Sequence, residues 1–271
     1  MQTDRTDVDT LFHNLWENYC RVTPSAERIH RLLDNSQGKA IVNDHIALRT
    51  FNIDKLNLDK LAAHFLALGY EQGGEYHFDA KKLYARHYEH PDPTVPKVFI
   101  SELLVEQCSD ALQSIVHQLV DNVSPSVVNQ SDFLYSGRHW NLDYATYQTL
   151  LEESEYAAWT AAWGYRPNHF TVSVNHLSQF RTLAEVNQRL KDEGFRLNTS
   201  GGEIKGSPQD LLEQSSTMAD RANVAFSDQT VSIPSCFYEF ALRYPKPDGE
   251  LYSGFVAASA DKIFESTDSK G

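Results

Sequence analysis

The hydrophobic pattern of the chain follows one order of elements that occurs twice. In the first copy, a strand-like run at 41–51 precedes a helical pattern of apolar residues that ends at Gly69. Three further strand-like runs follow, at 70–78, 82–89 and 97–105. This order predicts a βαβββ module.

The second copy repeats the order further along the chain. A strand-like run at 169–175 precedes a helical pattern that ends at Gly194. Strand-like runs then occupy 195–204, about 211–218 and 223–244, and the last is long enough for two strands around a turn. Two agreeing patterns support each other, so we expect a duplicated unit.

Helical patterns also occur outside the two modules. Leu11–Tyr19 has one apolar face, and a second helix is expected to begin at Thr23–Pro24. A helix after Ser109 and a long aromatic helix around 142–163 are expected between the modules. The predicted fold is α+β: two βαβββ modules form a curved mixed sheet around a shared site, with added N-terminal and inter-module helices. The expected parts of this one compact domain are N-terminal helices (1–38), module one (39–106), inter-module helices (107–165), module two (166–246) and a C-terminal tail (247–271).

Composition narrows the classes of partner. The chain has 271 residues, a formal net charge of -13 and three scattered cysteines. An acidic surface repels phosphate backbones and anionic lipid, so nucleic acid and membrane partners are not expected. Unpaired cysteine spacing and a polar N-terminus favour a cytoplasmic protein without a disulfide framework.

Histidines and glutamates stand at matching places in the two copies. His45 and His169 lie near the start of the first strand of each module, and Glu102 and Glu239 lie in later apolar strands. A buried glutamate needs a partner. Ligation by His45, His169 and Glu239 would leave positions open, as iron(II) oxygenases require. Glu102 as a possible fourth ligand would suit zinc, nickel or manganese acting as a Lewis acid.

Basic side chains near these ligands are candidates for substrate binding. Arg49 shares a strand face with His45, where its guanidinium could grip a carboxylate through two hydrogen bonds. Arg86 and Arg243 are weaker candidates for a second carboxylate, and Tyr84 could donate a hydrogen bond. The alternatives for these side chains are salt bridges across the sheet and, for the tyrosine, packing.

Three segments that carry these residues resemble a known family. NDHIALRTF at 43–51, NH at 168–169 and YEF at 238–240 are similar to the signature segments of the 2-oxoadipate dioxygenase/decarboxylases, also called D-2-hydroxyglutarate synthases. The resemblance covers about 40–245. It implies a fold similar to the vicinal oxygen chelate superfamily, an iron(II) triad of His45, His169 and Glu239, and Arg49 as a catalytic, carboxylate-binding residue.

The resemblance also implies a reaction. 2-Oxoadipate and dioxygen would be converted to 2-hydroxyglutarate and CO2, a step of lysine catabolism, with iron(II) or another divalent metal as cofactor. Two alternatives stay open at this point. The first is a non-oxidative metal-dependent lyase, isomerase or glyoxalase-like hydrolase that uses Glu102 as a ligand. The second is a small module that binds a dicarboxylate without turnover.

Overall fold

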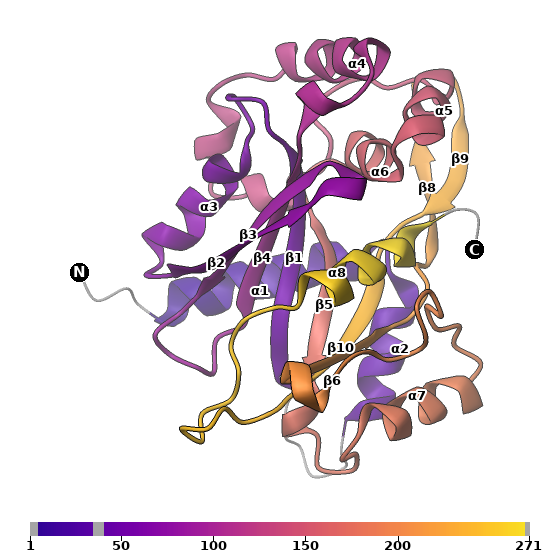
Figure 1. Ribbon diagram of the computed structural model, residues 1–271. Helices are drawn as coiled ribbons and strands as arrows, with labels where there is room; N and C mark the ends of the chain where they lie inside the picture. Colours follow the sequence, from indigo (N-terminus) through magenta and orange to yellow (C-terminus); the bar gives the residue numbers. More distant parts are fainter. Residues whose placement is uncertain (1–4, 35–40, 269–271) are drawn as a thin grey trace.

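The computed structural model describes residues 5–34 and 41–268. Eight strands form one curved sheet in the order β2-β3-β4-β1-β5-β10-β7-β6 (Figure 1). The strands of this sheet are β1 (Asn43–Phe51), β2 (Glu71–Phe78), β3 (Leu83–Glu89), β4 (Lys97–Leu103), β5 (Pro167–Ser173), β6 (Lys205–Ser207), β7 (Leu212–Ser216) and β10 (Phe237–Arg243). A separate hairpin is formed by β8 (Arg221–Ala225) and β9 (Thr230–Pro234).

The sheet consists of two halves with the same connectivity. In each half the first strand pairs in parallel with the last, β1 with β4 and β5 with β10. The halves join through the antiparallel pair β1–β5 at the centre of the sheet. This arrangement confirms the predicted α+β fold with two βαβββ modules and a curved mixed sheet.

Helices lie on both sides of the sheet (Figure 1). They are α1 (Arg5–Cys20), α2 (Pro24–Leu33), α3 (Leu58–Ala67), α4 (Asp110–Asp121), α5 (Tyr144–Glu153), α6 (Glu155–Trp163), α7 (Leu183–Asp192) and α8 (Ala257–Ile263). On the outer, convex face, Trp16 of α1 packs edge-on against Phe170 of β5. On the inner, concave face, α8 crosses in front of the sheet. No described helix is long and apolar enough to cross a membrane.

Local sequence sets the ends of the two module helices. The side chain of Asn57 caps α3, and Thr182 and Glu185 form a reciprocal capping box at the start of α7. Gly69 and Gly194, just beyond the two helices, have φ angles of 89° and 83°, a left-handed conformation that glycine adopts without strain. Both predicted helix ends are confirmed.

Other predicted elements differ from the structure. The helix expected around 142–163 is two helices, because Ser154 has extended backbone and its side chain caps α6. The run at 195–204 is not a strand; Gly201 and Gly202 both have positive φ angles, and β6 begins only at Lys205. The run at 223–244 was expected to contain two strands, but it contains the end of β8 and the whole of β9 and β10.

The C-terminal tail is a structural part of the sheet's concave face. It contains α8 and a 3-10 turn at Phe264–Thr267, which contact strands of both halves. Phe255, Ala260 and Ile263 are buried there. The predicted boundary between the N-terminal helices and module one, at 38 and 39, lies outside the described residues.

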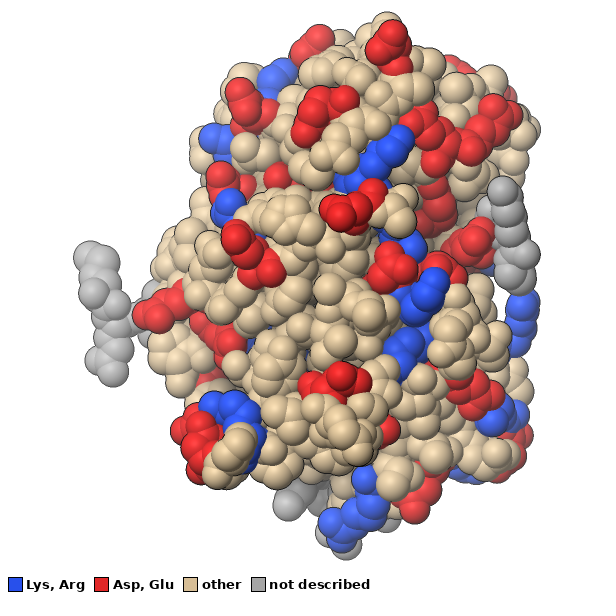
Figure 2. Space-filling view, viewed as in Figure 1, with Lys and Arg blue, Asp and Glu red and all other residues tan. Residues whose placement is uncertain are grey.

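The surface agrees with the acidic composition. On the face shown in Figure 2, acidic side chains are spread widely and basic ones are interspersed among them. Part of the concave face lies behind this surface, because α8 passes over it (Figure 1).

Candidate metal centre

Three side chains meet on the concave face, where the two halves join. His45 from β1, His169 from β5 and Glu239 from β10 each offer a ligand atom, and these atoms lie within 4.8 Å of one another. Glu239 Oε2 is 3.0 Å from His169 Nε2, and Glu239 Oε1 is 3.7 Å from His45 Nε2. All three residues are buried, and Glu239 is 0% exposed. The structure therefore brings the three predicted ligands together.

A β-bulge precedes each histidine. In the β1–β5 pair, Asp44 is an extra residue between the pairs of Asn43 and His45, and Asn168 is an extra residue just before His169. A bulge changes the direction of a side chain that would otherwise point to the opposite face. Asp44 Oδ1 thus lies 2.8 Å from His45 Nδ1, and Asn168 Oδ1 lies 3.1 Å from His169 Nδ1.

These contacts fix the tautomer and the orientation of the two imidazole rings. An oxygen beside Nδ1 accepts its proton, so the lone pair of each ring is left on Nε2. Both Nε2 atoms face Glu239. The two rings therefore have the tautomer and orientation of metal ligands.

The charges of the group are also those of ligands. Burial by itself would raise the pKa of the Glu239 carboxyl, but His45, His169 and a hydrogen bond from Gln214 together lower it. Gln214 Nε2 donates this bond to Glu239 Oε1 over 2.6 Å. Burial lowers the pKa of His169. The site thus favours an ionised carboxylate beside a neutral imidazole, the forms that bind a metal.

Two buried atoms in this group lack a hydrogen bond. Within the described part of the chain, neither His169 Nε2 nor Glu239 Oε2 has a hydrogen-bond partner. Two lone pairs this close, away from water, repel each other unless a cation or a proton lies between them. A divalent cation satisfies both atoms, and two imidazoles with one carboxylate suit iron(II) or zinc. The donor set fits such a metal.

Arg243 and Asp44 form a pair behind His45 that sequence reasoning missed. Arg243 Nε and Nη2 donate to the two carboxylate oxygens of Asp44 over 2.7 and 2.9 Å. Burial would raise the pKa of Asp44, but the Arg243 guanidinium and His45 hold it well below its usual range. Arg243 Nη1 donates to the carbonyls of Tyr252 and Gly254. Predicted as a substrate ligand, Arg243 instead supports His45 and holds the C-terminal segment.

Glu102 does not reach the group. It stands beside Thr50 in the β1–β4 pair, on the face opposite to His45, and its Oε2 accepts from Leu58 N over 2.8 Å. The carboxylate therefore holds the N-terminus of α3, where unpaired N–H groups attract negative charge. The suggestion of Glu102 as a fourth ligand was wrong, because the residue points to the convex side.

The strand register shows what replaces a fourth ligand. Glu239 stands beside Thr171, two residues after His169. The corresponding place in the first half is beside Ala47, two residues after His45, and Phe99 stands there. The two halves share the histidine, but only the second supplies a carboxylate.

Tyr84 and Arg86 also lie on the convex side. Arg86 Nε donates to Tyr84 Oη over 2.7 Å, and Arg86 Nη1 pairs with Asp59 of α3. Tyr84 Oη donates to Glu75. These side chains link β3 to its neighbours, and the suggestion that they bind substrate is corrected, because the pleat turns them away from His45.

Arg49 lies on the same face as His45, deeper along β1. Its guanidinium is within 5.6 Å of the ring centres of Tyr156, Trp159 and Phe264. Nη2 donates to Thr267 Oγ1 over 3.0 Å, and Nη1 lies 3.4 Å from Glu155 Oε1. Among the described residues, Nε has no hydrogen-bond partner. The Nε–H group of this buried guanidinium is thus a hydrogen-bond donor without a partner among the described residues.

Aromatic rings line the space beside the candidate ligands. Phe237 stacks on the ring of His169 with centroids 4.5 Å apart, and Phe255 meets the ring of His45 edge-on at 4.8 Å. Phe99 and Phe264 also line this cavity. Phe255 and Phe264 come from the C-terminal tail, which shows no repeat pattern, so sequence periodicity had no means of placing them here.

Comparison with known proteins identifies the family of this chain. The profile of the 2-oxoadipate dioxygenase/decarboxylase family matches residues 5–246. A rice (Oryza sativa subsp. japonica) protein is named 2-oxoadipate dioxygenase/decarboxylase, chloroplastic/amyloplastic. It is 37% identical over an alignment of 283 positions, which covers 95% of this chain and 78% of the relative.

Solved structures agree. The Oryza sativa hydroxyglutarate synthase in complex with 2-oxoadipate has a TM-score of 0.90 and 35% identity, covering 98% of this chain and 95% of the other. A Shewanella frigidimarina NCIMB 400 protein, for which the class hydrolase has been suggested, has a TM-score of 0.88 and 60% identity, covering 95% and 100%. For the fold alone, a Ralstonia eutropha JMP134 protein assigned to the glyoxalase superfamily has a TM-score of 0.78 at 22% identity, covering 93% and 86%. The chain belongs to the 2-oxoadipate dioxygenase/decarboxylase family.

Proposed function

We propose that this protein is an iron(II)-dependent dioxygenase that converts 2-oxoadipate and dioxygen to 2-hydroxyglutarate and CO2. The observation that carries the proposal is the buried group of His45, His169 and Glu239, with one carboxylate and no fourth protein ligand in the described cluster. Two comparisons support the choice of reaction. They are the name of the rice relative and the Oryza sativa hydroxyglutarate synthase structure, which contains 2-oxoadipate.

The three residues would hold the metal on one side. Bound iron(II) would supply a Lewis acid for the 2-oxo acid and the electrons that activate dioxygen. Asp44 and Asn168 keep Nε2 of the two histidines directed at it. Gln214 keeps the Glu239 carboxylate in place through its amide donor.

Arg49 is our candidate for holding a substrate carboxylate. Its guanidinium is buried, lies on the same strand face as His45 and has an unused Nε donor. A fixed guanidinium orients a carboxylate through charge-assisted hydrogen bonds, so the reacting end of the substrate meets the metal in one orientation. The aromatic rings of Tyr156, Trp159 and Phe264 surround the guanidinium and exclude water, which strengthens these interactions.

An oxygen electrode tests the reaction. The protein is loaded with iron(II) without oxygen, mixed with 2-oxoadipate and supplied with dioxygen. We expect consumption of one dioxygen for each CO2 and each 2-hydroxyglutarate formed. Loss of oxygen uptake in the His169→Ala variant, together with loss of bound metal, is expected as well.

Two rivals make different predictions for the same assay. A non-oxidative lyase, isomerase or glyoxalase-like hydrolase would turn over without oxygen uptake. The class suggested for the Shewanella relative, hydrolase, is the reason to test this rival. That rival loses its predicted fourth ligand, since Glu102 faces α3. A binding module would retain 2-oxoadipate unchanged. No oxygen uptake across a panel of 2-oxo acids would count against the dioxygenase.

We propose lysine catabolism as the setting of the reaction, as the resemblance to the family implies. Cytoplasmic location stays a prediction from the sequence, and the rice relative carries a chloroplastic/amyloplastic name.

A further inference from the structure

The cavity at the candidate ligands is too small for the proposed substrate. Its volume is about 20 Å³. Such a space holds roughly one water molecule. 2-Oxoadipate has to place its 2-oxo acid end there and still carry a carboxylate at the other end. Room for the rest of the molecule must come from a neighbouring cavity.

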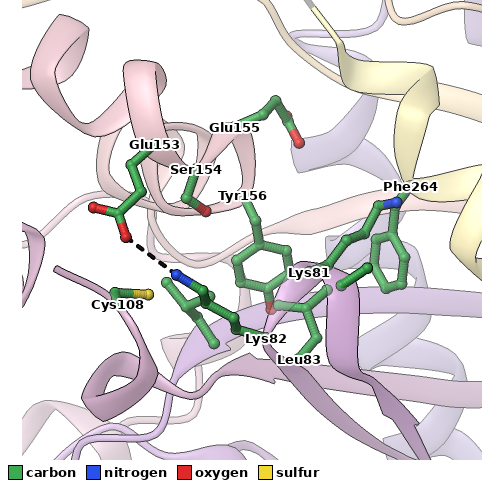
Figure 3. A pocket seen from close by; sticks show the side chains of 11 residues that line it. Lys81, Lys82, Leu83, Cys108, Glu153, Ser154, Glu155, Tyr156 and Phe264 are labelled. Atoms are coloured by element: carbon green, nitrogen blue, oxygen red, sulfur yellow. Dashed lines mark hydrogen bonds and ion pairs between the residues drawn. The ribbon is translucent and has the colours of Figure 1, made fainter.

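A second, outer cavity has a volume of about 160 Å³. Strands β3 and β4, the start of α6 and the C-terminal turn contribute to its walls (Figure 3). Phe264 lines both cavities. In Figure 3, Lys82 and Glu153 face each other at one end, with Nζ 3.3 Å from Oε1, and Phe264 and Lys81 lie at the other end. Phe264 is thus the residue that the linings of the two cavities have in common.

Two residues that line the outer cavity contact Arg49. They are Glu155 and Tyr156, and both contact the Arg49 guanidinium. The Phe264 ring centre is 5.6 Å from the same group. A dicarboxylate that extended from the inner cavity past Phe264 would therefore meet residues that contact a buried cation, and Lys81 and Lys82 line the same outer cavity.

The backbone around Phe264 is held in place. Asn198 Nδ2 donates to Lys262 O and to Ser266 Oγ, each over 2.9 Å, on the two sides of Phe264. The Phe264 ring is itself only partly buried and packs against Phe78 with centroids 5.2 Å apart. A rotation of the Phe264 side chain would therefore not require the anchored segment to move.

We propose that Phe264 is a movable partition, that the 2-oxo dicarboxylate reaches the metal through the outer cavity, and that its distal end stays there beside Arg49. This inference rests on the proposed function for the identity of the substrate. Phe264 then limits the chain length that the enzyme accepts, and it contacts the substrate at the junction of the two cavities.

The test follows ligand arrival at the metal, independent of turnover. Cobalt(II)-loaded full-length protein is mixed with oxalate, a small chelating dicarboxylate, and the change in cobalt absorption is recorded over time. We expect the association rate to rise severalfold in Phe264→Ala and Phe264→Leu and to fall severalfold in Phe264→Trp. Phe180→Ala is the matched control, because Phe180 is also partly buried but lines neither cavity, and it should leave the rate unchanged.

Substrate length gives a second readout. In the iron(II)-loaded enzyme, Phe264→Ala should raise kcat/KM for 2-oxosuberate relative to 2-oxoadipate by about tenfold, the usual scale for extra methylenes in a pocket. Equal oxalate rates in wild type, Phe264→Ala and Phe264→Leu, all with bound cobalt, would overturn the partition. If the oxalate rates change as expected but 2-oxoadipate does not bind, the partition stands and the proposed substrate fails.

Discussion

At the scale of single residues, the chemistry of the site depends on side chains adjacent to the ligands. Asp44 contacts His45 Nδ1 and accepts hydrogen bonds from Nε and Nη2 of Arg243. An ionised carboxylate behind an imidazole fixes the ring and makes Nε2 a better ligand. Asn168 serves His169 with a neutral oxygen. The two ligands are thus held alike but differ in the charge behind them.

The Asp44→Ala variant is expected to bind metal about 10–100-fold more weakly, the usual cost of losing such a partner. Asp44→Asn keeps an acceptor for Nδ1 and should lose less. Equilibrium dialysis against cobalt(II) measures both. Asp59→Ala is the control, because it also breaks an Asp–Arg pair but on the convex face. Equal affinity in Asp44→Ala and Asp59→Ala would contradict this role.

Lys205 is a second residue whose environment makes a prediction. It is 4% exposed, and its ammonium donates to the Asn198 carbonyl. Burial lowers its pKa from 10.5 to about 8. Between these pH values the unfolded chain binds the proton and the folded chain releases it, so stability must rise with pH in this window.

The Lys205→Met variant isolates this contribution. Relative to the variant, the wild type should gain free energy of unfolding as pH rises from 8 to 10.5, by at most about 3 kcal/mol. Urea unfolding of both proteins across this range measures the difference. A difference between them that stays constant with pH would show that the lysine titrates alike in both states.

Residue roles were predictable only where alternation along a strand decides them. That rule placed His45 and Arg49 on one face, as the structure has them. It did not predict the bulges at Asp44 and Asn168, because an extra residue is defined by the pairing of two strands distant in sequence. In a regular strand Asp44 would point away from His45. The pairing of Asp44 with Arg243 was therefore not expected, and Arg243 was predicted to bind substrate.

At the scale of elements, the position of α3 beside β4 explains why Glu102 points away from the candidate ligands. Its carboxylate accepts a hydrogen bond from the first residue of the helix, Leu58. Burial raises its pKa. The helix N-terminus offers unpaired N–H groups that favour a negative charge.

The Glu102→Gln variant should therefore lose stability and keep its metal. The expected loss is about 1 kcal/mol, typical of a weakened cap. Thermal unfolding measures the stability, and metal analysis of the same sample measures cobalt per chain. A metal content that falls as far as in His169→Ala would restore Glu102 as a ligand.

Helices and strands with a repeat counterpart were predictable. Gly69 and Gly194 mark equivalent helix ends, and the strands that follow begin within a few residues of their predicted positions in the first module. The segment 251–268 has no counterpart in the repeat. Its place over the concave face depends on contacts with strands of both halves, which no local pattern encodes.

At the scale of the whole molecule, the duplicated halves differ where it matters for chemistry. Each half supplies one histidine to the junction of β1 and β5, but Phe99 of the first half stands where the second half has Glu239. A symmetric pair of glutamates would give four protein ligands and a more closed site. The asymmetry leaves one side of the group to an apolar cavity covered by the C-terminal segment.

The most direct test is the position of the metal. Crystals grown without oxygen in the presence of iron(II) are measured on both sides of the iron absorption edge. The account predicts one anomalous peak within bonding distance of His45 Nε2, His169 Nε2 and a carboxylate oxygen of Glu239, with no peak at Glu102. A fully loaded protein with its iron peak elsewhere, or bonded to Glu102, would contradict it.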